Sequence, residues 1–493
     1  MSTTYPVALD LGSSSGRSAL GSFDGVRLTI DETHRFPIQV TQDGDALTWD
    51  AMGVLTQVWR GIGLSGAVAR GRGGSLSSVG VDTWGVDYGL LDVAGQLLRP
   101  PRAYRDPRTA RVEASFYSRV SREDGFASTG VEPALINTSM QLFADLEEDP
   151  ELACRVHRVL LMPDLFNFLL CGQEATGFSI ASTTGLMRAG SPQWDAQMLS
   201  RLGIPATWLP PIVGEPTVLG RIPAERAARH GVPELVVVHA GGHDTAAAVH
   251  AVPYDGRGAA FLSCGSWSIM GVERDAPIVT PEAMRAGFTN ECGLDGRVLF
   301  QKNITGLWLF QETLRRWREA GLEHTVTGLV EAAREAPGLL FHVDPAAQEF
   351  MQPGDLPERL AAACDRVYGR RPRTPGHLVR VVLESLALAY RRSLGELEAA
   401  TGEEIPVIHM VGGGTRNSLL CQLTADATGR RVVAGPAEAS AIGNLLAQLR
   451  VMGQLDSAES ARQVVRRSFD VSTYMPSGDE EPWQRAAERL AAG

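Results

Sequence analysis

The feature that most constrains the fold is a strand, turn and strand pattern that occurs twice in the chain. Residues 5 to 23 read YPVALDLGSSSGRSALGSF, and residues 259 to 271 read AAFLSCGSWSIMG. In each, two apolar runs flank a turn of small residues, which is typical of a β-hairpin. Two such hairpins, each with a turn that exposes backbone N–H groups, predict two related α/β domains with a ligand bound between them.

The size and composition of the chain agree with two packed domains. Its 493 residues exceed the roughly 250 to 300 at which a single hydrophobic core stops growing. The net charge of −11 argues against a sequence-independent grip on nucleic acid, which needs a basic surface. Neither a secretory signal nor a run of roughly 18 apolar residues is present. We therefore expect a cytoplasmic enzyme with no nucleic-acid partner and no membrane association.

Cysteine and lysine usage exclude several kinds of site. The six cysteines are scattered, without CxxC or zinc-ligand spacing, and we expect reduced thiols. Lys302 is the single lysine, in LFQKNITG. It fits neither a Walker A loop nor the strand lysine of a protein kinase. Any ATP site in this chain must therefore work without those lysine-based devices.

Helices and a glycine loop are readable along the chain. The pattern predicts helices from Ala51 to Ile62, over MPDLFNFLLCG up to Gly172, and over PGHLVRVVLESLALAYRRSLGELEAA, the last of these buried. A strand from Val407 to Val411 precedes the loop 412–414, and Asn417 is placed to cap a helix that ends at Gly429. A strand, glycine loop and helix in this order favour a nucleotide site at Gly413. The final segment PWQRAAERLAAG is predicted to be helical.

The two hairpin turns are candidate phosphate cradles. The turn of the first hairpin, Ser13, Ser14, Ser15 and Gly16, can point N–H and O–H groups inward, as can Gly265 and Ser266 in the second. Asp10, at the end of the first strand, would then hold Mg²⁺ directly or through water. The alternative is a pair of ordinary serine-rich turns. Cys264 is interpreted as a buried small hydrophobe, because its sequence neighbours would not lower a thiol pKa.

The stretch VDTWGVDYG combines groups that suit a sugar. Trp84 can stack on a sugar face, Gly85 allows a close backbone approach, and Asp87 can accept hydrogen bonds from hydroxyls. The alternative places Trp84 in the core and Asp87 at a turn. Nearby, Arg105, Asp106 and Arg108 suggest an internal ion-pair network or ligand contacts.

Two further segments carry polar candidates. In QKNITGLWLFQ, Asn303 and Gln311 offer amides, and on a strand Lys302 and Asn303 would point to opposite faces. In VVVHAGGHDTAAAVHAV, Asp244 follows a strand and two glycines and begins a helical pattern. It is suited either to cap that helix or to take the proton of a hydroxyl during phosphoryl transfer.

Taken together, these motifs resemble the FGGY carbohydrate kinase family over residues 5 to 450. The segments that carry the resemblance, in order, are ALDLGSSSGR, VDTWGVDYGLLD, AYRDPRT, LLMPDLFNFLLCG, GGHDTAAAV, SCGSWSIMG, KNITGLWLFQ and MVGGGTRN. Within that family, DTWGVD and GHDTA point to members that act on L-rhamnulose rather than on glycerol or xylulose.

The resemblance implies a fold, an activity and a set of site residues. It implies an actin-like, ribonuclease H-like two-domain fold with a catalytic cleft between the domains. Residues 1–246 would bind sugar and phosphate and residues 247–493 the nucleotide. The reaction would be ATP-dependent phosphorylation of L-rhamnulose at its 1-hydroxyl, with Mg²⁺. Asp244 resembles the family's proton acceptor. Gly85, His243, Thr245 and Asn303 match its sugar contacts, and Ser13, Ser14, Ser15, Gly16, Arg17, Ser266, Gln311 and Gly413 its ATP contacts.

Alternatives to this function differ in what they bind. A kinase of fuculose, ribulose or another ketose is the nearest, because residue types do not reveal which hydroxyl stereochemistry is recognised. A non-catalytic nucleotide-binding regulator has no need for the acid in GHDT. A Rossmann dehydrogenase would need GxGxxG after a strand and an acid about 20 residues later, and the motifs described here do not supply that pattern.

Overall fold

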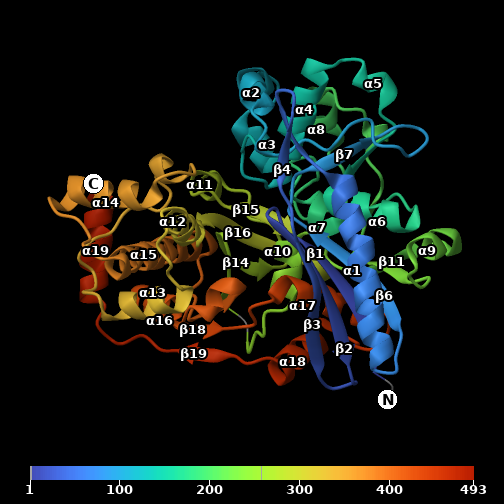
Figure 1. Ribbon diagram of the computed structural model, residues 1–493. Helices are drawn as coiled ribbons and strands as arrows, with labels where there is room; N and C mark the ends of the chain where they lie inside the picture. Colours follow the sequence, from blue (N-terminus) through green and yellow to red (C-terminus); the bar gives the residue numbers. More distant parts are fainter. Residues whose placement is uncertain (1–2, 257, 493) are drawn as a thin grey trace. The chain divides into compact units, whose positions relative to one another are not determined.

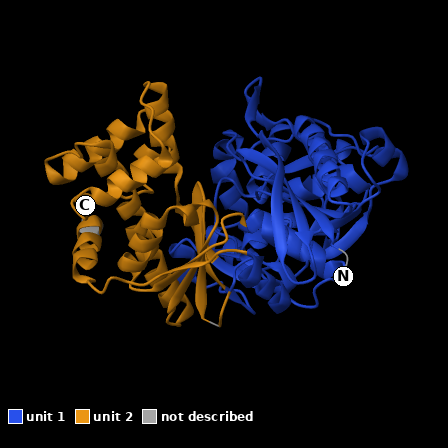
Figure 2. Ribbon diagram, turned by 60° about the horizontal axis from the view of Figure 1, so that its bottom comes forward, with its two compact units in different colours: residues 1–253, 273–300, 439–468 blue, residues 254–272, 301–438, 469–493 orange. Residues whose placement is uncertain are grey.

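The computed structural model describes residues 3–256 and 258–492, which form two compact units. Unit 1 comprises residues 1–253, 273–300 and 439–468, and unit 2 comprises residues 254–272, 301–438 and 469–493 (Figure 2). Each unit is therefore assembled from three separate stretches of the chain. In the part of the chain that is described, no helix has both the length and the apolar character needed to cross a bilayer.

Unit 1 is built on a six-stranded mixed sheet in the order β11-β12-β6-β1-β2-β3 (Figure 1). Its strands are β1 (Tyr5–Leu11), β2 (Ser15–Phe23), β3 (Leu28–Pro37), β6 (Leu76–Thr83), β11 (Thr217–Arg221) and β12 (Val236–His239). β1, β2 and β3 pair antiparallel, whereas β6 pairs parallel with both β1 and β12. The first predicted hairpin is thus confirmed.

One face of this sheet is covered by α1 (Ala51–Gly71) and α6 (Met162–Cys171). Asp50 caps α1 by accepting the Gly53 N–H, and Gly172 ends α6 in a left-handed conformation. Both helices confirm the sequence pattern, although α1 extends nine residues beyond the predicted end at Ile62. Because side chains alternate along a strand, Val7, Leu9 and Leu11 of β1 all join this apolar core.

The opposite face carries α10 (Asp244–His250) and α17 (Ala439–Val451). These two helices pack very closely. A Cβ added at Gly443 would lie 1.7 Å from the carbonyl oxygen of Ala247. α17 also contacts β1, β6 and β12. A helix from near the end of the chain therefore completes the layer behind the strands of the N-terminal half.

The second sheet repeats the strand arrangement of the first. Its order is β15-β16-β14-β13-β17-β18-β19, with the bounds β13 (Ala259–Cys264), β14 (Trp267–Arg274), β15 (Thr289–Cys292), β16 (Val298–Thr305), β17 (Val407–Val411), β18 (Arg431–Ala434) and β19 (Ser472–Tyr474). β13 and β14 form an antiparallel hairpin, and β17 and β18 continue parallel to β13. The predicted second hairpin is confirmed.

The helices of unit 2 also agree with the sequence pattern. The buried helix is α15 (Pro375–Thr401), and α16 (Ser418–Thr428) is capped by the Asn417 side chain and ended by Gly429, as predicted. α19 (Glu481–Ala492) packs against α15, and its Trp483 is buried. The other helices of this unit are α12 (Trp308–Glu319), α13 (Val326–Glu335) and α14 (Leu356–Tyr368).

Smaller elements connect the two sheets to the rest of the chain. In unit 1 they are β4 (Val40–Asp43), β5 (Ala46–Trp49), β7 (Tyr88–Leu91), β8 (Arg158–Leu161), β9 (Thr176–Gly177), β10 (Ile212–Val213), α2 (Arg108–Arg119), α3 (Arg122–Thr129), α4 (Thr138–Glu148), α5 (Leu152–Arg155), α7 (Phe178–Ala181), α8 (Ala196–Leu202), α9 (Ala224–His230), α11 (Pro281–Arg285) and α18 (Ala458–Ser468).

Candidate active site

Two carboxylates meet at the carboxyl ends of neighbouring parallel strands. Asp10 on β1 pairs in register with Asp82 on β6. Both alternate with residues of the apolar core, so both point to the opposite face, which α10 and α17 cover. Asp10 is held by Arg17, whose Nη2 lies 2.5 Å from Oδ2. Roles for Asp10 and Arg17 were predicted from the sequence, whereas Asp82 was not singled out.

Asp82 is fully buried beside Asp10. Burial, and next to it the charge of Asp10, raises the pKa of Asp82 well above its ordinary value. Asn444 of α17 donates to Oδ2 at 2.6 Å. Among the described residues, Oδ1 has no hydrogen-bond partner. An unsatisfied carboxylate oxygen at this depth is unusual in a folded protein and calls for a partner.

The turn of the first hairpin leaves its tip accessible. Gly12 donates its N–H to the Ser15 carbonyl at 3.1 Å, Ser14 is exposed, and Ser13 and Ser15 are half-buried. Gly16 differs from these serines, because a Cβ there would lie 2.4 Å from the Phe36 ring. Packing against Phe36 thus explains this glycine. The predicted ATP contacts of the turn stay predictions.

The loop that follows β12 is fixed by hydrogen bonds to its backbone. Glu215 Oε1 accepts the Gly242 N–H at 2.7 Å, and Ser179 Oγ accepts the His243 N–H at 3.2 Å. Thr83 donates its N–H to the Gly242 carbonyl, which brings the loop beside the end of β6. No local sequence pattern singles out Glu215.

Behind this loop, a buried ionic triad surrounds His239. Its two ring nitrogens lie 3.2 Å from Asp164 and 3.5 Å from Glu215. Burial alone would lower the pKa of His239, but these two carboxylates raise it to about 10. The imidazolium of His239 offsets the negative charge of Glu215, and Glu215 in turn anchors the loop.

Asp244 is the first residue of α10 rather than its cap. The N-cap position belongs to His243, and in the described structure that end of the helix has no side-chain cap. The predicted capping role of Asp244 is therefore wrong by one position. Its carboxylate accepts the Thr245 hydroxyl at 3.2 Å and keeps 31% of the side chain exposed. Burial raises the pKa of Asp244, and the charge of His243 opposes that rise.

His243 lies between two carboxylates. Its Nε2 is 3.5 Å from Asp244 Oδ1, and its Nδ1 is 3.0 Å from Oε2 of Glu291 on β15. Burial lowers the pKa of His243, but Glu291, Asp244 and Glu215 together raise it to about 9. A Cβ added at Gly85 would lie 3.4 Å from His243 Nε2. The structure thus brings together Gly85, His243, Asp244 and Thr245, all predicted from the sequence.

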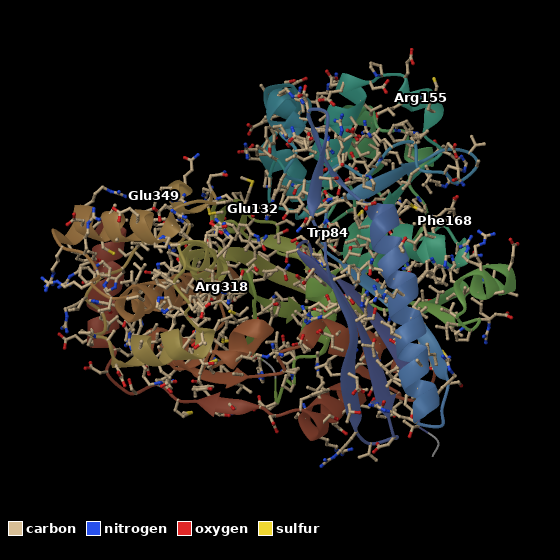
Figure 3. The ribbon with its side chains drawn as sticks, viewed as in Figure 1. Trp84, Glu132, Arg155, Phe168, Arg318 and Glu349 are labelled. Atoms are coloured by element: carbon tan, nitrogen blue, oxygen red, sulfur yellow. The ribbon has the colours of Figure 1, made fainter. Side chains whose placement is uncertain are left out.

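Trp84 and Asp87 belong to a buried cluster near this loop. Trp84 donates its N–H to Asp87 Oδ2 at 2.9 Å, and Trp49 donates to the same oxygen at 2.7 Å. Trp84 follows β6 at the end of the first sheet (Figure 3), where its backbone N–H donates to the Leu11 carbonyl. Burial raises the pKa of Asp87 to about 6. The indole N–H of Trp84 and the carboxylate of Asp87 are thus already hydrogen-bonded inside the protein. The sugar contacts of these two residues stay predictions.

Between these two residues, Val86 has a strained backbone. Its φ of 68° lies in the left-handed region, which a β-branched residue rarely adopts. Thr138 donates its hydroxyl to the Val86 carbonyl, and Thr183 accepts the Val86 N–H. Strain held in place by surrounding contacts clusters at functional sites.

The AYRDPRT segment forms the predicted internal network. Arg108 is 1% exposed and lies 3.0 Å from Asp145 and 3.4 Å from Asp106. Asp106 also accepts the Leu47 N–H. Arg105 instead lies over the Tyr104 ring on the surface. Asp106 and Arg108 therefore stabilise the fold.

Unit 2 brings two predicted ATP contacts together at its own hairpin turn. Ser266 Oγ lies 2.7 Å from Gln311 Oε1, and both residues are exposed. On β16, Asn303 is exposed while Lys302 bonds Glu396 of α15 at 2.6 Å, which confirms that the two point to different sides. Cys264 is fully buried, and burial raises the pKa of its thiol, as expected for an inert residue.

The three glycines of the loop 412–414 have different reasons to be glycine. Gly412 has a φ of 87°, and a Cβ on Gly414 would lie 2.2 Å from the Cys264 sulfur. At Gly413, by contrast, no described atom lies within 4 Å of an added Cβ. Packing therefore does not explain Gly413, which leaves close approach of a ligand as a reason for it.

Metal-ligand chemistry in unit 1 fits a cation held largely through water. The described residues include no group of three histidine, cysteine or acidic side chains placed to hold a metal ion directly. Asp10, Asp82 and Asp244 nevertheless interact through their charges. Hard carboxylate oxygens suit Mg²⁺, which keeps several waters and takes one or two protein carboxylates along with phosphates.

Comparison with known proteins identifies the family. Residues 5–250 match the model of the N-terminal domain of the FGGY family of carbohydrate kinases, and residues 260–452 match that of its C-terminal domain. A rhamnulokinase from Bacteroides thetaiotaomicron is 36% identical over 479 residues, which cover 97% of each chain.

Solved structures agree at the level of the fold. A ligand-bound xylulose kinase from Lactobacillus acidophilus superposes with a TM-score of 0.80 at 14% identity, over 99% of this chain and 97% of that one. A glycerol kinase from Plasmodium falciparum with ADP gives 0.78 at 14% identity over the same shares. These confirm the predicted two-domain α/β kinase fold. The chain belongs to the FGGY family of carbohydrate kinases and is an ATP-dependent sugar kinase.

Proposed function

We propose that this enzyme phosphorylates L-rhamnulose at its 1-hydroxyl, with Asp244 as the proton acceptor. The substrate rests on the 36% identity to a rhamnulokinase over 97% of both chains. The role of Asp244 rests on one observation. Of the three acidic residues at this end of the sheet, Asp10 and Asp82 are 6% and 0% exposed, whereas 31% of the Asp244 side chain is exposed. Only Asp244 can readily meet a sugar hydroxyl.

The reaction balances with one base. As the sugar oxygen forms its bond to the γ-phosphorus, the bond from that phosphorus to the bridging oxygen of ADP breaks. Asp244 accepts the hydroxyl proton and later releases it to solvent. The carboxylate stands in the first turn of α10, where the helix dipole favours its ionised form. His243 adds a positive charge 3.5 Å away.

ATP and Mg²⁺ would be held by the residues that the sequence predicts for them. Asp10 would hold Mg²⁺, which supplies charge neutralisation for the transferred phosphoryl group. The turn Ser13–Arg17, Ser266 and Gln311 would bind phosphates, and the open space over Gly413 suits the adenine and ribose side of the nucleotide. Gly85, Thr245 and Asn303 would orient the sugar.

Asp244→Asn tests the base. Asparagine keeps the shape of the side chain but accepts no proton, so we expect kcat to fall by about 10² to 10⁴-fold, with ATP affinity and the melting temperature nearly unchanged. Asp24→Asn, in an exposed turn, is the matched control and should keep full activity. Near-normal turnover of Asp244→Asn would remove Asp244 from the mechanism.

A panel of ketoses tests the substrate. L-rhamnulose, fuculose, ribulose and xylulose are compared by kcat/KM with saturating ATP and Mg²⁺, and product position is read by ³¹P NMR. We expect the highest kcat/KM for L-rhamnulose. A higher value for another ketose would overturn the substrate assignment and leave the role of Asp244 untouched.

A further inference from the structure

We propose that Glu291 is a positioning residue for the proton acceptor, acting through His243. Glu291, His243 and Asp244 form a chain of carboxylate, imidazole and carboxylate with separations of 3.0 and 3.5 Å. In this row of three side chains, Glu291 keeps the imidazole of His243 oriented and positively charged. The imidazolium in turn keeps Asp244 ionised. The inference rests on the proposed role of Asp244 as base.

Two carboxylates on opposite sides of the ring favour an imidazolium. A neutral histidine has one N–H, so it can serve only one of two flanking carboxylates, whereas the cation has an N–H on each nitrogen. Both ring nitrogens of His243 face a carboxylate. The His243 side chain is 10% exposed and that of Glu291 is 11% exposed, so water screens this pair weakly.

Glu291 is held rigidly enough to orient the ring. Its two neighbours on β15 are both anchored within unit 1. The Cys292 N–H is donated to Ser182 Oγ at 2.8 Å, and the Asn290 N–H to the Gly130 carbonyl at 2.8 Å. His243 is itself fixed through its backbone N–H to Ser179. The ring therefore joins two separately anchored segments.

The charge on His243 matters because the surroundings of Asp244 oppose ionisation. Burial and the nearby charge of Asp10 raise the pKa of Asp244, and His243 is the main group that lowers it. The charged groups that act on His243 itself are Glu291, Asp244 and Glu215. Glu291 is the strongest of these and is not needed as the base, which leaves it free for this supporting role.

The direct test is the titration of His243 by NMR. The wild-type enzyme is labelled on its histidine rings, and the His243 resonance is assigned by its loss in His243→Gln. We expect His243 to remain protonated at pH 7.5 in the wild type and to be mostly neutral there in Glu291→Gln. A neutral His243 at pH 7.5 in the wild type would overturn the proposal whether or not the variant folds.

The second readout is the pH profile of kcat with L-rhamnulose or the best ketose of the panel. Without the imidazolium, the acid limb should move to higher pH by about one unit, which is about a tenfold loss of kcat below both pKa values. Glu273→Gln is the matched control, because Glu273 is another largely buried carboxylate, paired with Arg462 at 2.7 Å. It should leave the profile unmoved.

A double variant separates this role from a purely structural one. If Glu291 acts through His243, Glu291→Gln should have little further effect on kcat in a His243→Gln background. Independent, multiplying losses would contradict the proposal. A failure of the proposed role of Asp244 as base gives a different result. Asp244→Asn would then retain turnover, whereas the His243 titration would still shift in Glu291→Gln.

Discussion

Asn444 donates a 2.6 Å hydrogen bond to Asp82 across 362 positions of sequence. The bond belongs to a buried polar chain behind the first sheet. Gln448 donates to Asn444 Oδ1 at 2.7 Å and to the Val7 carbonyl at 2.9 Å, and it accepts the Ser78 hydroxyl at 2.7 Å. Gly80 leaves room for the chain, since a Cβ there would lie 2.5 Å from Asn444 Oδ1. α17 thus reaches the acidic end of the sheet through side-chain amides.

Asn444→Ala should destabilise the protein. It removes the hydrogen bond to Asp82 Oδ2 and, within the part of the chain that is described, leaves neither oxygen of this fully buried carboxylate with a partner, which costs about 1 to 3 kcal/mol. Urea unfolding measures the loss. Asn303→Ala, at an exposed asparagine, should change the free energy of unfolding by less than about 0.5 kcal/mol. Equal stability of the two variants would show that the polar chain contributes little.

The sequence predicted local structure better than the residues that support the site. The two hairpins, the strand 407–411 and the helix from Asn417 to Gly429 follow from side-chain alternation, caps and glycines within a few residues of each other. Asp10 and Asp244 were identifiable because each ends a strand inside a recognisable motif. Asp82 lies within VDTWGVD but was not predicted, since its significance depends on its register with Asp10 and on Asn444.

Glu291 was not identifiable for the same reason. The sequence around it, NEC at residues 290–292, contains no motif. Its partner His243 lies 48 positions earlier in the chain than Glu291. Likewise, no local pattern shows that residues 439–468 belong to unit 1. That placement depends on the fit between Gly443 and Ala247, a tertiary contact that side-chain periodicity does not encode.

Two buried imidazolium ions should make the protein lose stability in mild alkali. His239 and His243 have pKa values of about 10 and about 9 in the folded state, against an ordinary value of 6.5. Their contribution is complete below pH 6.5 and is lost as the pH rises through 9 to 10, because the unfolded chain releases these protons first. Between pH 6.5 and 8.5, each histidine should lower the free energy of unfolding by up to about 1.4 kcal/mol per pH unit.

Denaturant unfolding at several pH values measures this loss, and Asp164→Asn checks its origin. The substitution removes one of the two carboxylates around His239, so the loss between pH 6.5 and 8.5 should shrink. A wild-type free energy of unfolding that stays constant over this range would contradict the charge assigned to both rings.

Gly413→Ala should weaken ATP binding without weakening the fold. An added methyl group there meets no described atom within 4 Å, so it would project into the space assigned to the nucleotide. We expect KM for ATP to rise about tenfold, equivalent to about 1.4 kcal/mol, with little change in melting temperature. Gly414→Ala is the contrasting variant and should lose stability, because its methyl group would collide with the Cys264 sulfur. An unchanged KM in Gly413→Ala would argue against nucleotide contact at this loop.

Gly443→Ala should disrupt the contact between α17 and α10 and, through it, the helix that begins at Asp244. Its methyl group would lie 1.7 Å from the Ala247 carbonyl oxygen, so the helices must separate, at a cost of about 1 to 3 kcal/mol or more. Gly395→Ala in α15 is the matched control, since no described atom lies within 4 Å of its added Cβ. There alanine should stabilise the helix by about 0.5 to 1 kcal/mol. Thermal unfolding gives both values, and kcat should fall only in Gly443→Ala, because only that change displaces the helix carrying the base. Stabilisation by both substitutions would mean that the two helices are not locked together at Gly443.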